Sequence, residues 1–163
     1  MPRLVIIGAG PAGLALAGFI RLLDSDITIT IYEAKDSDAR RIPASIPPYA
    51  LSLLSQLIGS KLPGLLAAHR HLLGSHSCWE SSTPGYNDFF VNAEGRGYLL
   101  KRPKFEQQLA AIMLKNDIQI YYRHRLERFN FDRTQRQWQL QLRHGQETLS
   151  SSADFIVDAT GPQ

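Results

Sequence analysis

A glycine-rich turn near the start of the chain constrains its fold more than any other feature. Gly8, Gly10 and Gly13 have the spacing GxGxxG. They follow the apolar run 4–7, typical of a buried parallel strand, and open the segment 12–23, which has apolar residues at helical spacing. Such glycines permit a tight turn, approach of a pyrophosphate to the backbone and close helix–strand packing, while the helix N-terminus offers N–H groups and a positive dipole end. The pattern predicts a dinucleotide-binding βαβ unit.

An acidic residue at the end of the next strand narrows the choice of dinucleotide. Residues 27–32 alternate in the manner of a second strand, and Glu33 follows them, twenty residues beyond Gly13. A carboxylate at this place accepts a ribose hydroxyl and repels a 2′-phosphate, which disfavours NADP. FAD and NAD both carry an adenosine diphosphate half, so the turn alone leaves both of them open.

The rest of the chain predicts an α/β fold with antiparallel additions. The elements expected after residue 33 are, in chain order, a polar loop at 34–48, a helix at 48–58, short irregular strands and turns at 74–98, an amphipathic helix at 102–116, a third parallel strand at 118–122, antiparallel hairpins at 126–151 and a final strand at 155–158. Together they indicate a Rossmann-like α/β fold with a parallel sheet and an antiparallel β meander. Part of a second, substrate-side β region is expected at 70–100.

Composition excludes several classes of protein. The 163 residues suffice for one domain, or for one domain and part of a second. The single cysteine, Cys78, excludes an internal disulfide and suits a reducing cytoplasm, where we expect the protein to be. The chain has no apolar run long enough for a transmembrane helix, and its net charge of +3 is too small to indicate nucleic-acid binding.

Several segments, taken in order, resemble a known enzyme family. They are GAGPAGLALA, YEA, PPYALSLLSQLIG, CWESS, GRGYLLKRPKFEQQL and DFIVDATG. In this order they resemble the FAD-dependent oxidoreductases related to tryptophan halogenases and aromatic-ring monooxygenases, over nearly the whole chain. The resemblance implies that the glycine-rich turn holds FAD. The residues that it assigns to the cofactor are Gly8, Gly10, Pro11, Ala12, Gly13, Glu33, Ala34, Arg41, Arg102, Asp158 and Gly161.

Two of these assignments have a structural alternative. The resemblance places the Arg102 guanidinium along the diphosphate of FAD, whereas the alternative is an exposed arginine at a helix start. It also places residues 158–161 beside the glycine-rich turn. There Gly161 allows a close approach of the backbone, and Asp158 serves either the cofactor or only the turn itself.

Departures from the family pattern bear on the reaction. Ala44 stands where many relatives have a glutamate ahead of a proline pair, so any role of that carboxylate near the flavin is absent. No lysine lies between Leu62 and Trp79, where halogenases use one, so halogenation is disfavoured. The resemblance then implies a flavin-dependent oxidoreductase of the monooxygenase kind, with a small organic substrate and NAD(P)H as a transient electron donor. No residue is assigned as a catalytic acid or base.

The resemblance also bears on how much of an enzyme the chain contains. Relatives continue well past the Ala-Thr-Gly segment, so residues 1–163 are expected to form an incomplete FAD-binding domain that does not turn over a substrate alone. The final strand is then expected to leave a sheet edge for a second copy or a completing chain. Two other interpretations stay open, namely an NAD-binding, dehydrogenase-like module and a non-catalytic FAD-binding fragment.

Three clusters look chemical, but a structural role is favoured for each. A metal site is disfavoured at His69, His71, His76 and Cys78, whose spacing matches no zinc pattern, and Cys78 lacks a partnered base as a nucleophile. Solvated histidines and a buried thiol are expected instead. Arginines between 123 and 143 lie among aromatic residues, but a solvated outer sheet face is favoured over a nucleic-acid surface. Trp79, Phe89 and Phe90 are expected in the core rather than in a substrate cavity. The arginines and their aromatic neighbours are Arg123, Arg125, Arg128, Arg133, Arg136, Arg143, Tyr121, Tyr122 and Trp138.

Overall fold

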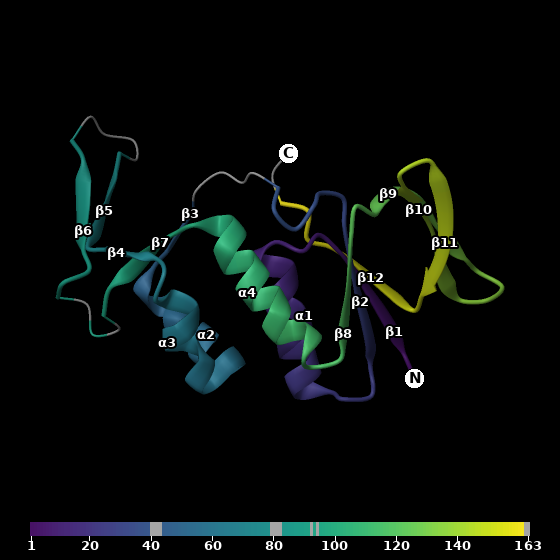
Figure 1. The fold of residues 1–163 in the computed structure, drawn as a ribbon, viewed down its shortest axis with the longest axis horizontal. Coiled ribbons are helices and arrows are strands. Elements are labelled where there is room, and N and C mark those ends of the chain that lie inside the picture. The colour runs from purple at the N-terminus through teal and green to yellow at the C-terminus, as the bar shows by residue number, and fades with distance from the viewer. Residues whose placement is uncertain (40–43, 79–82, 92, 94, 162–163) are drawn as a thin grey trace. The chain divides into compact units, whose positions relative to one another are not determined.

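The computed structural model describes residues 1–39, 44–78, 83–91, 93 and 95–161 (Figure 1). The chain divides into two compact units. The first unit combines residues 1–39 with residues 106–163, and the second consists of residues 40–105. None of the helices in the described part of the chain is long and apolar enough to cross a membrane.

The first unit is built on a parallel sheet. Strands β1 (Arg3–Ile7), β2 (Thr28–Glu33), β8 (Ile118–Tyr122) and β12 (Phe155–Asp158) pair in the order β12-β1-β2-β8, and every pairing is parallel. Helix α1 (Pro11–Leu23) connects β1 to β2 and contacts β1, β2 and β8. The predicted Rossmann-like βαβ unit is thus confirmed, with each element within one residue of its expected ends.

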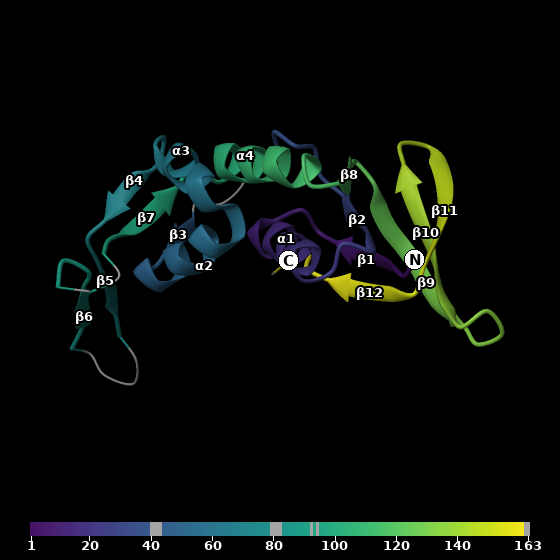
Figure 2. The same cartoon turned by 90° about the horizontal axis from the view of Figure 1, so that it is seen from below.

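An antiparallel meander covers part of the other face of this sheet. Strands β9 (Arg125–Asp132), β10 (Gln137–His144) and β11 (Glu147–Ala153) form it in the order β11-β10-β9. Figures 1 and 2 both show α1 and the meander on opposite sides of the parallel sheet. The meander is held there by apolar packing, because inward side chains of β1, β10 and β11 form one buried cluster. Its members are Val5, Ile7, Leu140 and Ala153.

Strand β12 is an outer strand of the parallel sheet. Within the described part of the chain it pairs with β1 alone, and Phe155 at its start is 61% exposed. Parallel strands are usually buried on both sides. Among the described residues, β12 therefore has one edge without a partner strand.

The second unit contains small antiparallel sheets and short helices. Strands β3 (Ala44–Ile46), β7 (Gly97–Leu100) and β4 (Arg70–Leu72) pair in the order β3-β7-β4. The remaining elements are α2 (Pro48–Ile58), the 3-10 helix η1 (Gly59–Lys61), α3 (Leu62–Leu66), and the ribbon of β5 (Gly74–Ser77) with β6 (Gly85–Asp88). The prediction of a continuous loop over 34–48 is wrong, because Ala44–Ile46 pair with β7.

Helix α4 (Arg102–Leu114) crosses the boundary between the units. Its predicted apolar face is mostly confirmed: Phe105, Leu109 and Met113 are buried, whereas Ile112 is only half-buried. The helix ends at Leu114, two residues before the predicted end. Apolar residues at helical spacing thus identified the helix, and burial of three of them stabilises it.

Candidate dinucleotide-binding site

The glycine-rich turn is held between the ends of two strands. Gly8 has φ of +112°, a conformation that favours glycine, and its N–H donates to the Tyr32 carbonyl oxygen at 2.8 Å. A Cβ atom at Gly8 would lie 2.4 Å from the Ala159 carbonyl oxygen. The N–H of Ala159 in turn donates to the Ile7 carbonyl oxygen at 2.8 Å. The close approach of the segment after β12 therefore leaves no room for a side chain at position 8.

Helix α1 begins in the turn without a side-chain cap. Gly10 is the N-cap residue, with φ of −72° and ψ of 178°, and Pro11 follows in the first helical turn. The N–H groups of Ala12 and Gly13 receive no acceptor from a capping side chain, so they present a positive dipole end at the turn. A Cβ atom at Gly13 would lie 2.0 Å from the Gly8 carbonyl oxygen. The third glycine therefore brings the helix against the turn.

Glu33 places a buried carboxylate beside this turn. It ends β2 and is 8% exposed. Its Oε2 atom accepts the Ala9 N–H at 3.0 Å, and its Oε1 atom accepts the Lys35 N–H at 2.9 Å. Because a carboxylate oxygen accepts more than one hydrogen bond, the same group can also accept a ribose hydroxyl. Ala34, the neighbouring predicted contact, is exposed. Sequence spacing could place Glu33 but gave no sign of these two N–H donors.

Residues 158–161 form a tight turn next to Gly8. Asp158 Oδ1 accepts the Thr160 N–H at 2.9 Å and the Thr160 hydroxyl at 2.7 Å. The hydrogen bond from the backbone N–H, followed by that from the hydroxyl, lowers the pKa of Asp158. Gly161 has φ of +76°. Within the structure as described, Asp158 holds this turn, and Gly161 serves it by backbone conformation.

Of the two predicted arginine contacts, only Arg102 lies among the described residues. Arg102 is the first residue of α4 and is half-buried. Arg41 lies outside the described residues. Contact of either arginine with a cofactor therefore stays a prediction.

The fold is that of flavin-dependent halogenases and monooxygenases, which confirms at the level of fold the resemblance seen in the sequence. No protein-family model and no curated protein matches the chain. Solved structures do match it. The flavin-dependent halogenase CmlS has a TM-score of 0.81 at 22% identity, over 98% of this chain and 29% of its own.

Two further solved structures show the same likeness. The myxobacterial chondrochloren halogenase CndH, an FAD-dependent halogenase, has a TM-score of 0.79 at 22% identity, over 98% of this chain and 37% of its own. The p-nitrophenol 4-monooxygenase PnpA from Pseudomonas putida DLL-E4 has a TM-score of 0.73 at 16% identity, over 99% of this chain and 42% of its own. The chain thus spans less than half the length of each of these proteins.

The histidine and cysteine cluster has the predicted environment only in part: His71 and His76 are exposed, as expected. His69 is 8% exposed, although solvated histidines were expected, and Cys78 is exposed, although a buried thiol was expected. The His69 ring packs edge-on against the Phe105 ring, whereas Cys78 directly follows strand β5, whose residues are mostly exposed. Among the described residues, no three His, Cys, Asp or Glu side chains are grouped to hold a metal ion.

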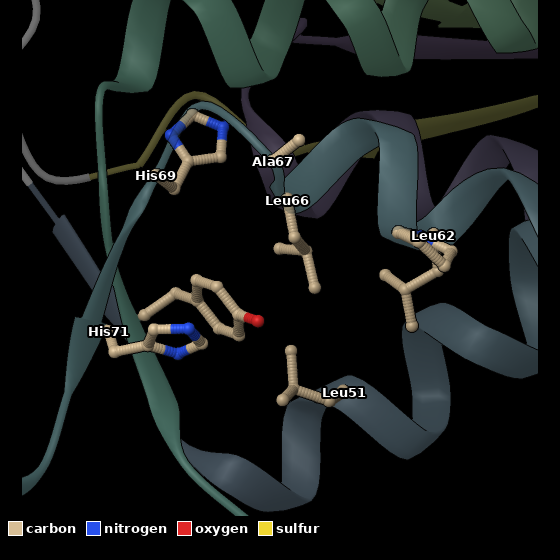
Figure 3. Close-up of a pocket in the computed structure, with 8 residues that line it drawn as sticks. Leu51, Leu62, Leu66, Ala67, His69 and His71 are labelled. Carbon is tan, nitrogen blue, oxygen red and sulfur yellow. The ribbon is translucent and has the colours of Figure 1, made fainter.

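A pocket of about 420 Å³ lies in the second unit, beside His69 (Figure 3). Its volume is in the range of small-molecule sites. Helices α2 and α3 supply an apolar side and the β4 region supplies imidazoles, as Figure 3 shows. Labelled residues that line it are Leu51, Leu62, Leu66, Ala67, His69 and His71. No feature of the sequence indicated this pocket.

His69 is a buried, neutral imidazole. Its Nδ1 atom accepts the Lys101 N–H at 3.1 Å, so the ring proton resides on Nε2, which has no hydrogen-bond partner among the described residues. Burial, followed by the charges of Lys101 and Lys104, lowers the pKa of His69 from its ordinary value of 6.5. The unfolded chain therefore binds a proton at His69 at a higher pH than the folded chain does. As a result, the free energy of unfolding decreases as the pH falls through about 6.5.

We expect His69→Asn to reduce this loss. Asparagine keeps an acceptor for the Lys101 N–H but cannot be protonated, so urea unfolding at about pH 7.5 and about pH 5.5 should differ less than in the wild type. His76→Asn, at an exposed histidine of the β5–β6 ribbon, is the matched control and should leave the difference unchanged. An equal pH dependence in His69→Asn and wild type would contradict the assignment.

The aromatic and arginine clusters are only partly as predicted. Phe89 is buried, as expected of a core residue, but Phe90 is 72% exposed and lies under the Arg96 guanidinium. Trp79 lies outside the described residues. The arginines of the meander are exposed at its strands and turns, as expected. Arg123, in the turn between β8 and β9, is exposed as well and makes an ion pair with Asp36.

Proposed function

We propose that this chain is the FAD-binding portion of a flavin-dependent oxidoreductase, of the monooxygenase kind. One observation carries the proposal: the buried Glu33 carboxylate lies beside an uncapped helix N-terminus within a glycine turn. That arrangement provides a ribose acceptor and a diphosphate cradle together. The fold shared with flavin-dependent halogenases and monooxygenases supports FAD rather than NAD as the dinucleotide.

The residues of the turn would divide the work of binding. The Ala12 and Gly13 N–H groups would donate to the diphosphate, and Gly10, without a side chain, would let it approach. Glu33 would accept a ribose hydroxyl. Asp158 would stabilise the turn at residues 158–161, which lies next to Gly8.

The chemistry of the proposed enzyme would come from the cofactor. Bound FAD supplies electron transfer and the activation of oxygen for insertion into an organic substrate, with NAD(P)H as the electron donor. The protein's part is to bind, to orient and to exclude water. Monooxygenation is favoured over halogenation because the sequence lacks a lysine between Leu62 and Trp79. The chain spans less than half of the matching enzymes, so we expect no turnover at an ordinary rate from it alone.

A titration that separates the two halves of FAD tests the proposal. Flavin fluorescence should change on binding of FAD, and ADP should displace it, because the described turn fits the adenosine diphosphate half. FMN, which lacks that half, should bind far more weakly, and NADP should compete poorly because of Glu33. Saturable FAD binding that ADP does not displace would contradict the assignment of the turn, and tighter binding of NAD than of FAD would contradict the choice of cofactor.

A further inference from the structure

The turn between β8 and β9 holds the backbone that follows Glu33. The His124 N–H donates to the Glu33 carbonyl oxygen at 2.9 Å, and the Arg123 N–H donates to the Lys35 carbonyl oxygen at 3.2 Å. The Arg123 guanidinium also reaches the Asp36 carboxylate, with Nε 2.6 Å from Oδ2. Three successive contacts therefore fasten residues 33–36 to a segment almost ninety positions further along the chain.

Arg123 adopts a backbone conformation that arginine normally avoids. Its φ is +61°, in the left-handed region that favours glycine and asparagine. Such strain persists only where the surrounding structure holds the residue in place, and it marks positions with a structural or functional task. Here the left-handed turn lets the N–H and the guanidinium of one residue contact Lys35 and Asp36 together.

Lys35 connects this clamp to the candidate site. Its carbonyl oxygen accepts the Arg123 N–H, while its own N–H donates to Glu33 Oε1. A displacement of residues 34–36 would therefore move the donor that orients the Glu33 carboxylate. We propose that Arg123 is a positioning residue, which through Asp36 and Lys35 orients the Glu33 carboxylate for the ribose of the dinucleotide. This inference rests on the proposed function.

Because the Arg123–Asp36 ion pair is exposed, its removal should affect the local position of residues 34–36 more than the stability of the whole protein. The Arg123 and Asp36 side chains are 67% and 35% exposed. The hydrogen bond from Arg123, followed by that from the Ser37 N–H, lowers the pKa of Asp36. Exposed pairs of this kind contribute little to the stability of a whole protein. Loss of the pair should thus loosen residues 34–36 while the fold remains.

The chain offers a matched control for this pair. Arg143 and Glu127 form another exposed ion pair, with Nε 2.5 Å from Oε1 and side chains 55% and 28% exposed. It joins β9 to β10 on the meander, away from the Arg123–Asp36 pair itself. Arg143→Ala therefore removes a similar charge and a similar pair without touching the proposed clamp.

Amide exchange and cofactor affinity, measured together, test the proposal. In the apo protein, Arg123→Ala should accelerate exchange of the Lys35 amide, and in FAD titrations it should weaken binding about fivefold. Asp36→Asn should have a similar effect, Arg123→Lys should restore most of the affinity, and Arg143→Ala should change neither measurement. The urea midpoint of each variant should stay close to that of the wild type.

Each contrary result has a defined meaning. Unchanged Lys35 exchange in Arg123→Ala would overturn the proposal, as would faster exchange with unchanged FAD affinity, or equal effects in Arg143→Ala. If the wild type binds no FAD, the proposed function fails. The exchange experiment on the apo protein then still decides whether Arg123 orders the segment that holds Glu33.

Discussion

Gly13→Ala is expected to destabilise the first unit by about 3 kcal/mol or more. The added Cβ would lie 2.0 Å from the Gly8 carbonyl oxygen and 3.2 Å from its carbonyl carbon. Both are backbone atoms of a turn that Ala159 already presses from the other side, so neither can move away cheaply. The gain of about 1 kcal/mol that alanine usually brings to a helix interior is too small to offset this clash. Urea unfolding followed by circular dichroism measures the loss.

Gly64→Ala is the matched control for this substitution. Gly64 also lies in a helix, α3, but a Cβ atom there would have open space around it. The same change should therefore leave stability unchanged or raise it slightly. A Gly13→Ala protein as stable as the Gly64→Ala protein would show that α1 does not pack on the turn as described.

Gly10→Val is expected to weaken FAD binding at least about 100-fold while the chain stays folded. The φ of −72° and ψ of 178° at Gly10 are open to any residue, so valine brings no backbone strain. Its side chain would instead occupy the space through which a diphosphate reaches the Ala12 and Gly13 N–H groups. The dissociation constant from flavin fluorescence and the urea midpoint of the apo protein measure the two effects separately.

Gly85→Val serves as the control for the second substitution. Gly85 begins β6, where a Cβ atom would meet only ordinary contacts, and valine suits a strand. Its FAD affinity should equal that of the wild type. Wild-type FAD affinity in Gly10→Val would refute the proposed binding site, whatever the stability of the variant.

For Gly8, Gly10 and Gly13, the sequence predicts the turn but not the separate role of each glycine. Their spacing, with a strand before and a helix after, predicts the turn, because each signal is local and depends on backbone chemistry. It does not tell which glycine serves folding and which serves a ligand. The structure shows that backbone atoms approach Gly8 and Gly13 closely, whereas Gly10 has an ordinary backbone conformation, and its role towards a ligand stays a prediction.

For Glu33, too, the sequence predicts the position, and only the structure shows the contacts. Its position at the end of the second strand follows from the alternation of residues 27–32 and from its distance to Gly13. Its hydrogen bond with the Ala9 N–H, and the contact of the Arg123 N–H with the segment that follows it, come from distant parts of the chain. No periodicity reports such contacts, because they depend on how strands meet in space.

The sequence by itself determined the parallel βαβ unit, the meander and the amphipathic helix, because turn residues and the spacing of apolar residues specify them locally. Only the tertiary structure decided that Ala44–Ile46 form a strand, since that segment gains hydrogen-bond partners from Tyr98–Leu100, more than fifty residues away. Only the tertiary structure, too, decided that His69 is buried with its Nδ1 atom accepting the Lys101 N–H, and that Cys78 is exposed. Burial and long-range pairing depend on which elements cover one another, and that is settled when the chain packs.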